Sequence, residues 1–496
     1  MIIGADIDIH AREAGAKSAL ACGDESLDWR QFAALTNRTA NWLNSVAPEH
    51  ASVALLLPNC AALPVLFFAI ARSGRNALVL DPAWPASIVA PLLQKLGSAL
   101  AIGSKGTILP GQRGLMLDER NSLRALHELV QGFADAFEPT ALPEHIFYTG
   151  FTSGSTGMPK GYRRNHRSWT ESFRAERIEF GNNPADIVVA PGSLSHSLFL
   201  YAVTHALHIG ATAVIARHFR PSAIPDLVSA HRGSLLYGVP SQLMTIAAAP
   251  PRGMSGSNSL RRIISSGSKW PQGTRDALRS KFPHAGFAEF YGASELSFVS
   301  VAREEDATPA GSVGRPFATV EVSIRDDDCQ PVPPGTAGEI FVRSSMLFDG
   351  YAGEENGGVL AARDGYASVG DMGYLDANGC LFLAGRKDRM IVTAGKNLYP
   401  EEIEQVLMTH PAIEAAMVLP DPDPLRGSRI VAAVNLSEGA SVSAAEMIGY
   451  ARRHLPLFKV PRRYYRVGEW PRTRSGKSDF ERIANMLSYG VRELLP

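Results

Sequence analysis

Apolar runs of strand length alternate with helical patterns over the first part of the chain. Residues 53–57 form an apolar run that Pro58 ends, residues 63–71 have the pattern of an apolar helix, and residues 77–80 form a second strand-like run before Asp81. This alternation predicts a mostly parallel sheet covered by helices. Since such sheets bind ligands at the carboxyl ends of their strands, functional loops are expected directly after apolar runs.

The pattern changes near residue 385. Pro400 is expected to begin a helix with two glutamates in its first turn, which suits the helix dipole. Two strand-like runs at 414–419 and 430–436 then lead to a helix at 444–454. A helix with two or three strands makes a small α+β unit.

We therefore expect two domains, an N-terminal body over residues 1–387 and a C-terminal domain over residues 388–496. The expected fold class is α/β, with a large N-terminal body of sheets covered by helices and a small α+β C-terminal domain.

Composition excludes several classes of protein. The 496 residues carry 49 Lys and Arg against 49 Asp and Glu, and 45% are hydrophobic. A disordered chain would have lower hydrophobicity and higher net charge, and a nucleic-acid partner would require a basic field. The most membrane-like stretch, residues 198–216, contains His205 and His208. A buried helix that runs into a strand explains it better than a membrane span.

The four cysteines are far apart in the sequence, which predicts neither a disulfide framework nor a thiolate metal site. The first eight residues contain two acidic residues and no basic n-region, so they do not resemble a signal peptide. We expect a reducing, cytoplasmic location.

Residues 151–161, Phe-Thr-Ser-Gly-Ser-Thr-Gly-Met-Pro-Lys-Gly, are the strongest functional signal. They follow a strand-like run at 145–148 and precede a helical run at 168–178. Backbone N–H groups of a glycine-rich turn bind anions, and one lysine with four hydroxyls suits phosphate. The spacing differs from a Walker A loop, because Gly161 stands where Ser or Thr should follow Lys160. A flexible linker would not need the Pro-Lys-Gly ending.

Further motifs accompany this loop over about 400 residues. They lie at residues 80–85 (Leu-Asp-Pro-Ala-Trp-Pro), 191–196 (Pro-Gly-Ser-Leu-Ser-His), 289–295 (Glu-Phe-Tyr-Gly-Ala-Ser-Glu), 370–374, 385–389, 395–402 and 471–477. In content and order they resemble the motifs of the adenylate-forming enzymes, which include acyl- and aryl-CoA synthetases, firefly luciferase and nonribosomal peptide synthetase adenylation domains. The chain is most similar to a stand-alone acyl-CoA synthetase.

The resemblance implies that the chain activates a carboxylic acid as acyl-AMP with ATP and Mg²⁺, releases pyrophosphate, and transfers the acyl group to coenzyme A. Glu295 would bind Mg²⁺. Asp371 would bind the ribose, and Tyr291 would stack on adenine. The implied ATP- and AMP-binding residues are Thr152, Ser153, Gly154, Ser155, Thr156, Gly157, Lys160, Ser266, Gly267, Ser268, Phe290, Tyr291, Gly292, Ser294, Asp371, Arg386 and Lys477.

The implied catalytic residues are Lys477, His196 and Thr152. Lys477 would bridge the carboxylate and α-phosphate oxygens. The C-terminal domain is then implied to be a mobile lid that rotates about a hinge at Asp388 for the thiol step, with Gly395 in the thiol channel.

The acid and the acceptor stay open. Ser197 lies where amino-acid-activating members have an Asp, so an α-amino acid is disfavoured. The implied acyl pocket is mainly apolar, which leaves fatty, cyclic and aromatic acids. Its residues are His196, Ser197, Tyr201, Ser241, Phe290, Phe298 and Val299.

Coenzyme A is the expected acceptor, and an acyl carrier protein acting in trans is the alternative. Oxidation of the adenylate, as in luciferases, and a non-catalytic binding protein on the same scaffold are less favoured. No nucleic-acid partner and no membrane span are expected.

Overall fold

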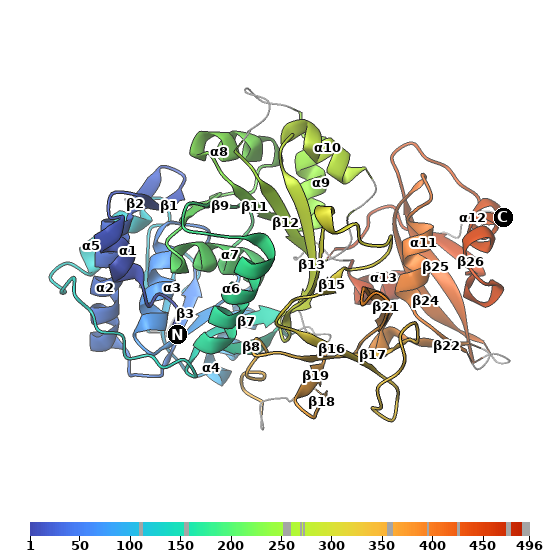
Figure 1. Cartoon of the computed structure of the whole chain (residues 1–496), viewed down its shortest axis with the longest axis horizontal. Helices are drawn as coiled ribbons and strands as arrows, with labels where there is room; N and C mark the ends of the chain where they lie inside the picture. Colours follow the sequence, from blue (N-terminus) through green and yellow to red (C-terminus); the bar gives the residue numbers. More distant parts are fainter. Residues whose placement is uncertain are drawn as a thin grey trace. The chain divides into compact units, whose positions relative to one another are not determined.

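The computed structural model describes residues 1–108, 113–152, 158–250, 259–267, 270, 273–354, 361–393, 396–423, 427–472 and 478–488. The chain forms two compact units (Figure 1). The N-terminal unit comprises Met1–Val322 and Val342–Val369, and the C-terminal unit comprises Ser323–Phe341 and Gly370–Pro496. The C-terminal unit thus includes residues 323–341 and 370–387 in addition to the predicted domain. The boundary between residues 387 and 388 was placed at the implied hinge, Asp388, and both the boundary and the hinge stay predictions.

The largest sheet of the N-terminal unit has nine described strands in the order β15-β14-β13-β12-β11-β9-β10-β1-β2. Its inner strands are parallel, whereas β2, β14 and β15 are antiparallel to their neighbours. The strands are β1 (Ser18–Cys22), β2 (Glu25–Asp28), β9 (Ile187–Ala190), β10 (Thr212–Ile215), β11 (Leu235–Gly238), β12 (Arg262–Ser266), β13 (Gly286–Ala293), β14 (Ser297–Arg303) and β15 (Arg315–Pro316).

Helices cover both faces of this sheet. Apolar residues of α8 (Ile224–His231), α9 (Pro240–Ala248) and α10 (Thr274–Lys281) pack with the strands in one buried cluster. Helix α7 (Ser197–His208) packs against β9, β10 and β11, and α6 (His166–Phe180) lies beside it through Phe173 and Tyr201. The apolar stretch at residues 198–216 is therefore a buried helix followed by β10, as predicted.

The second sheet of this unit has the described order β6-β5-β3-β4-β7-β8. All its strands are parallel except β8. They are β3 (Ser52–Leu56), β4 (Asn76–Val79), β5 (Ser98–Gly103), β6 (Gly114–Met116), β7 (Ile146–Thr152) and β8 (Lys160–Asn165). Helix α3 (Ala62–Arg72) contacts β4 and β7 of this sheet, α4 (Ala86–Lys95) packs on it through Val89 and Leu92, and α5 (Ser122–Leu129) contacts α3. Helix α2 (Trp29–Val46) contacts α3, α1 (Ile7–Glu13) and strands β1 and β2 of the first sheet. Both sheets confirm the predicted α/β class.

Short strands follow the large sheet in the sequence. They are β16 (Glu321–Arg325), β17 (Gly338–Arg343), β18 (Ala361–Arg363), β19 (Tyr366–Ser368), β20 (Asp371–Leu375) and β21 (Leu381–Arg386). Strands β20 and β21 pair antiparallel, and β22 (Ile391–Thr393) pairs antiparallel with β23 (Lys396–Leu398). Single helical turns occur at η1 (Pro221–Ala223), η2 (Glu304–Asp306), η4 (Lys387–Arg389) and η5 (Leu457–Lys459).

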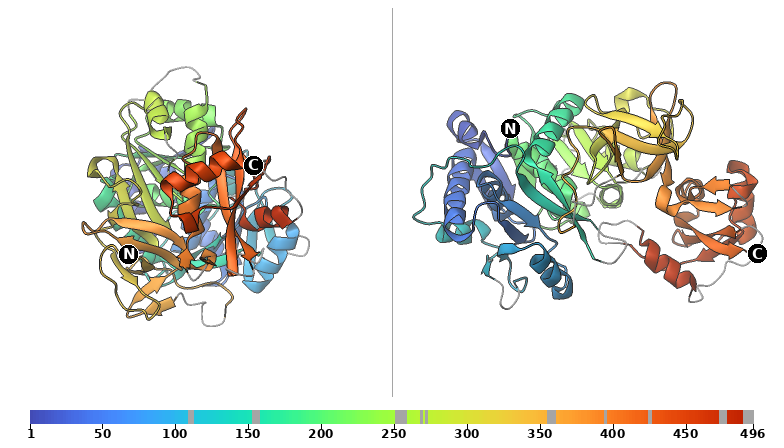
Figure 2. Two further views of the ribbon diagram at one scale, coloured as in Figure 1. Left: turned by 90° about the vertical axis from the view of Figure 1, so that its right-hand side faces the viewer. Right: turned by 90° about the horizontal axis from the view of Figure 1, so that it is seen from below.

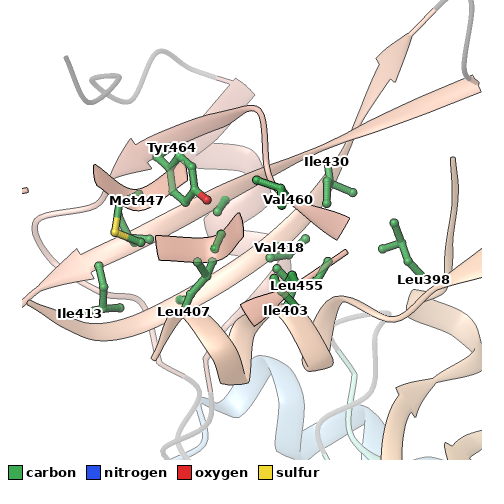
Figure 3. Packing of buried hydrophobic residues seen from close by; sticks show 14 of the residues in the cluster. Leu398, Ile403, Leu407, Ile413, Val418, Ile430, Met447, Leu455, Val460 and Tyr464 are labelled. Atoms are coloured by element: carbon green, nitrogen blue, oxygen red, sulfur yellow. The ribbon is translucent and has the colours of Figure 1, made fainter. Parts of the chain in front are cut away.

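The C-terminal unit, drawn in orange and red in Figure 2, combines strands with helices. Its sheet has three described strands in the order β24-β25-β26. They are β24 (Ile413–Asp423), β25 (Gly427–Leu436) and β26 (Arg463–Arg466), with helices α11 (Pro400–Leu407), α12 (Ala444–His454) and α13 (Phe480–Ser488). Along β24, Val418 packs into the cluster with α11 and α12 (Figure 3), whereas Met417 and Leu419 pack with Ile483 of α13. Successive side chains of a strand point to opposite faces of a sheet. Helices α11 and α12 therefore cover one face, and α13 covers the other. The predicted α+β unit is confirmed, including the helix that begins at Pro400.

All four cysteines are free. Among the residues that the structure describes, no helix combines the length and the apolar character that a bilayer crossing requires.

Candidate active site

The hydroxyl-rich loop joins two antiparallel strands. Strand β7 ends at Thr152, β8 begins at Lys160, and these two residues are paired. Lys160 is exposed and Thr152 is half-buried, so both lie at the base of the loop. The sequence did not predict β8, because its residues Lys-Gly-Tyr-Arg-Arg-Asn form no apolar run.

Ser294 and Glu295 lie in the turn between β13 and β14. The register of these strands shifts after Tyr291, and Gly292 is paired with Phe298. A Cβ at Gly292 would lie 2.1 Å from the backbone oxygen of Ser297. Because backbone cannot move aside at that distance, only glycine allows this close approach of the two strands.

Arg164 of β8 forms a hydrogen bond with the backbone of this turn. Its side chain is almost fully buried. Its guanidinium donates to the backbone oxygen of Ser294 at 3.0 Å, to the backbone oxygen of Met346 at 2.7 Å and to the hydroxyl of Ser168 at 3.1 Å. Burial lowers the pKa of Arg164. The guanidinium thus joins the turn to β8 with donors in a fixed planar arrangement.

Tyr351 connects the loop lysine with the turn glutamate. Its hydroxyl donates to Oε1 of Glu295 at 2.8 Å, and Nζ of Lys160 lies 5.5 Å from the centre of its ring. We call the following group of residues the polar corner: Lys160, Arg164, Ser294, Glu295 and Tyr351.

The implied adenine residues lie on neighbouring parallel strands. Ser266 is the last residue of β12 and is paired with Phe290 of β13, one residue before Tyr291. Gly267 follows with a φ of +106°, and none of the described residues places an atom within 4 Å of the position of a Cβ there. These residues therefore lie where the carboxyl ends of two parallel strands meet, which is where sheets of this kind bind ligands.

Aromatic rings gather among the residues of the implied acyl pocket. The rings of Phe290 and Phe298 are 4.7 Å apart, Phe298 stacks on Phe317 at 4.8 Å, and Tyr201 lies 5.4 Å from Phe298. These four residues are called the aromatic wall below. Val299 is the buried neighbour of Phe298 on β14.

His196 and Ser197 follow β9, and Ser241 follows β11. His196 immediately precedes α7, and Ser241 lies in the first turn of α9. Burial lowers the pKa of His196, and the nearby Asp81 carboxylate opposes this shift. The imidazole is therefore neutral at pH 7.

The buried hydroxyl of Tyr162 lies between the two regions. It is 3.0 Å from the hydroxyl of Tyr148. Burial raises the pKa of Tyr162, and hydrogen bonds with Tyr148, Ser197 and Ser294 oppose the shift. Ser197 of the implied acyl pocket and Ser294 of the polar corner thus share one buried partner.

In the C-terminal unit, Asp371 and Arg386 are paired across β20 and β21. Nε of Arg386 lies 3.7 Å from Oδ1 of Asp371 and 3.3 Å from Oδ1 of Asp388. The implied ribose residues and the implied hinge residue are therefore neighbours. The remaining implied residues lie outside the described residues, namely Ser153, Gly154, Ser155, Thr156, Gly157, Ser268, Gly395 and Lys477.

Two family models match the chain. The model of the AMP-binding enzyme covers residues 7–352, and that of the AMP-binding enzyme C-terminal domain covers residues 402–477. The chain belongs to the AMP-binding enzyme family.

Relatives in this AMP-binding enzyme family include YhfT, an uncharacterized acyl-CoA ligase of Bacillus subtilis (strain 168). It is 35% identical over 478 residues, which cover 96% of each chain. A feruloyl-CoA synthase of an Amycolatopsis species is 28% identical over 94% of this chain and 95% of the relative.

Solved structures of AMP-binding enzymes share the fold. The o-succinylbenzoate CoA synthetase of Bacillus subtilis, in complex with the acyl-adenylate intermediate, has a TM-score of 0.85 at 24% identity and covers 99% of both chains. ATP-bound MatB of Rhodopseudomonas palustris has a TM-score of 0.87 at 22% identity and covers 97% of this chain and 98% of its own.

Two residues of the polar corner were missed by sequence reasoning. Arg164 follows the phosphate loop in an Arg-Arg pair with no apolar neighbour, and its partners Ser294 and Met346 are 130 and 182 residues away, so no local signal marked it as buried. Tyr351 had no local signal, because its partner Glu295 is 56 residues away.

Proposed function

We propose that this chain activates a carboxylic acid with an apolar acyl group and transfers that group to coenzyme A. The reaction class is ATP-dependent acid–CoA ligation through an acyl adenylate, with Mg²⁺. The observation that carries the assignment is the polar corner, where one cation and one carboxylate meet on Tyr351 at the base of a hydroxyl-rich loop.

The chemistry requires two anions to meet, the acid and the α-phosphate of ATP, so charge neutralisation and alignment are central. In our proposal, Lys160 and the loop hydroxyls hold the β- and γ-phosphates, and Ser294 contacts the α-phosphate. Asp371 and Arg386 bind the ribose. Lys477 bridges the two reacting anions in the first step, and rotation about Asp388 prepares the second.

Glu295 would hold Mg²⁺, which neutralises phosphate charge when bound. Among the described residues, no group of three or more His, Cys, Asp or Glu side chains is placed to hold a metal ion. Mg²⁺ does not require such a group, because it is typically held by one or two carboxylates together with substrate phosphates and water. Glu295 is half-buried and its Oε1 accepts a hydrogen bond from Tyr351, so a second carboxylate oxygen is present for this role.

The aromatic wall and the uncharged Ser197 support an apolar acid. An α-amino acid would bring an ammonium group that these residues do not neutralise. The feruloyl-CoA synthase among the relatives acts on an aromatic acid, and other relatives have the name putative long chain fatty acid-CoA ligase. We therefore propose that the substrate is an aromatic or fatty acid.

A cytoplasmic location stays a prediction.

The test is ATP–pyrophosphate exchange over a panel of aromatic, cyclic, fatty and α-amino acids, followed by addition of coenzyme A. We expect exchange with an apolar acid and formation of its CoA thioester. Exchange without a thioester would favour a carrier protein acting in trans. A complete lack of exchange with every acid would contradict the proposal and favour a non-catalytic protein.

A further inference from the structure

Tyr351 contacts both charged side chains of the polar corner. Its hydroxyl donates to Oε1 of Glu295 at 2.8 Å, and its ring lies under Nζ of Lys160 at 5.5 Å. Within the described part of the chain, neither Lys160 nor Glu295 forms an ion pair with any residue. Both charged side chains therefore contact the same tyrosine, Glu295 at its hydroxyl and Lys160 at its ring.

The backbone fixes the position of this tyrosine on both sides. Residues 348–352 run along the outer edge of β8. Ala352 N donates to the backbone oxygen of Gly161 at 2.7 Å, and Arg163 N donates to that of Gly350 at 3.0 Å. Tyr351 itself forms a bridge with Tyr162. The side chain of Tyr351 is thus held at a defined place beside the base of the phosphate loop.

The same segment is fixed to the turn that carries Glu295. Phe348 N donates to the backbone oxygen of Glu295 at 2.9 Å. The phenol then holds one carboxylate oxygen, which restricts the rotamer of Glu295. A carboxylate has about four lone-pair sites, so the second oxygen keeps its sites for a hard cation.

The ring has a second effect on Lys160. A lysine is a flexible point charge, and the face of an aromatic ring attracts it and limits its orientations. Without the tyrosine, two flexible side chains of opposite charge at this corner could pair with each other. That pairing would occupy both groups before the nucleotide arrives.

From these contacts, we infer that Tyr351 is a positioning residue for Mg²⁺ and the nucleotide. It keeps Glu295 and Lys160 apart and oriented, Glu295 toward the metal and Lys160 toward the phosphates. This inference rests on the proposed function, because it requires a metal nucleotide at the polar corner. Groups that hold a metal-binding carboxylate by a hydrogen bond typically change metal affinity by 10- to 100-fold when they are lost.

The chain offers a matched control at Tyr366 of β19. The hydroxyl of Tyr366 donates to Oε2 of Glu321 at 3.1 Å, and the guanidinium of Arg343 lies 4.6 Å from the centre of its ring. Tyr366 thus has the same two kinds of contact outside the polar corner. Tyr351→Phe and Tyr366→Phe each remove one phenol–carboxylate hydrogen bond and keep the ring.

The experiment measures Mn²⁺ binding by electron paramagnetic resonance, with and without a non-hydrolysable ATP analogue, and the Mg²⁺ dependence of ATP–pyrophosphate exchange. For Tyr351→Phe we expect a Kd for Mn²⁺ with nucleotide about 10-fold higher. The Mg²⁺ concentration for half-maximal exchange should rise similarly, with little change in kcat at saturating Mg²⁺ or in KM for the acid. Tyr351→Leu, which also removes the ring, should in addition weaken nucleotide binding.

Tyr366→Phe should match the unsubstituted chain in every assay, and thermal melting of all variants shows whether they fold. A Tyr351→Phe variant with unchanged Mn²⁺ binding and unchanged Mg²⁺ dependence overturns the inference, and so does an equal change in Tyr366→Phe. If the unsubstituted chain neither exchanges pyrophosphate nor binds Mn²⁺ with nucleotide, the proposed function fails as well. Normal exchange with an insensitive Tyr351→Phe contradicts only the role of Tyr351.

Discussion

Phe290 and Tyr291 are neighbours on β13, yet they border two regions that are built differently. In the polar corner, positions depend on a few directed hydrogen bonds, such as those from buried Arg164 to Ser294 and Met346. In the aromatic wall, positions depend on ring packing between Phe290, Phe298 and Phe317. A directed bond is either made or lost, whereas packing changes gradually with side-chain volume.

The difference separates two properties of the enzyme. Substitutions of residues that bind ATP should change ATP binding or ATP–pyrophosphate exchange by the same factor for every acid. Substitutions in the aromatic wall should alter which acid is preferred and leave KM for ATP unchanged. Each of the following substitutions tests this separation.

The largest effect is expected for Lys477→Ala. ATP–pyrophosphate exchange should fall by at least about 10²-fold for every acid, because a charge that stabilises the reacting oxygens is lost. Thioester formation from preformed acyl adenylate should stay largely intact. Lys459→Ala, which removes an ammonium group paired with Glu402, is the control from the same unit. Equal losses in both half-reactions would contradict the assignment of Lys477.

Arg164→Met should reduce both stability and ATP binding. It removes the donor to the buried carbonyl of Met346, at a cost of roughly 1–3 kcal/mol in the free energy of unfolding, and the donor to the half-buried carbonyl of Ser294. KM for ATP should rise, because the turn that carries Glu295 loses its support.

The matched control is Arg72→Met. Arg72 is another buried arginine of the same unit, and it donates to Asp8 and Asn37. Chemical denaturation and exchange kinetics should find lower stability in both variants but a higher KM for ATP only in Arg164→Met. A higher KM in both would mean that the effect reflects general destabilisation.

Phe298→Leu should change acid preference and leave ATP handling intact. The smaller side chain enlarges the acyl side, and roughly 1–3 kcal/mol of discrimination is typical for one methylene in an apolar pocket. We expect kcat/KM for a bulky acid to shift about 10-fold relative to a small one. Phe32→Leu, at a buried position in α2, is the control. A changed KM for ATP with unchanged acid preference would contradict the separation of the two regions.

The smallest effect concerns His196 and pH. Burial lowers the pKa of His196 below its ordinary value of 6.5, and Asp81 partly opposes this. The neutral form is thus favoured in the folded state. Its contribution to stability is present above pH 6.5 and is lost as the pH falls toward the lowered pKa.

In a pH profile of kcat/KM for the acid, the acid limb of the curve should lie below pH 6.5. Asp81→Asn removes the opposing carboxylate and should move this limb to lower pH, and His196→Gln should lack it. A shift of the limb to higher pH in Asp81→Asn would contradict the role of Asp81.

Local patterns predicted the regular elements well. Residues 63–71 lie within α3 and residues 444–454 are α12, because apolar periodicity reports which face of an element is buried. The alternation of strands and helices predicted the parallel sheets. Strand β8 was missed, since it has no apolar run and its buried charged residue, Arg164, is held by hydrogen bonds to Ser294 and Met346.

The family and the reaction class were predictable from the motifs along the chain. The contacts of Tyr351 with both Lys160 and Glu295, and the hydrogen bond of Arg164 with the turn at Ser294, became known from the three-dimensional fold. The physical reason is that motifs report chemistry within a few residues of one loop. The pairing of β8 with residues 348–352 joins segments almost 190 residues apart, and no local pattern encodes such a contact.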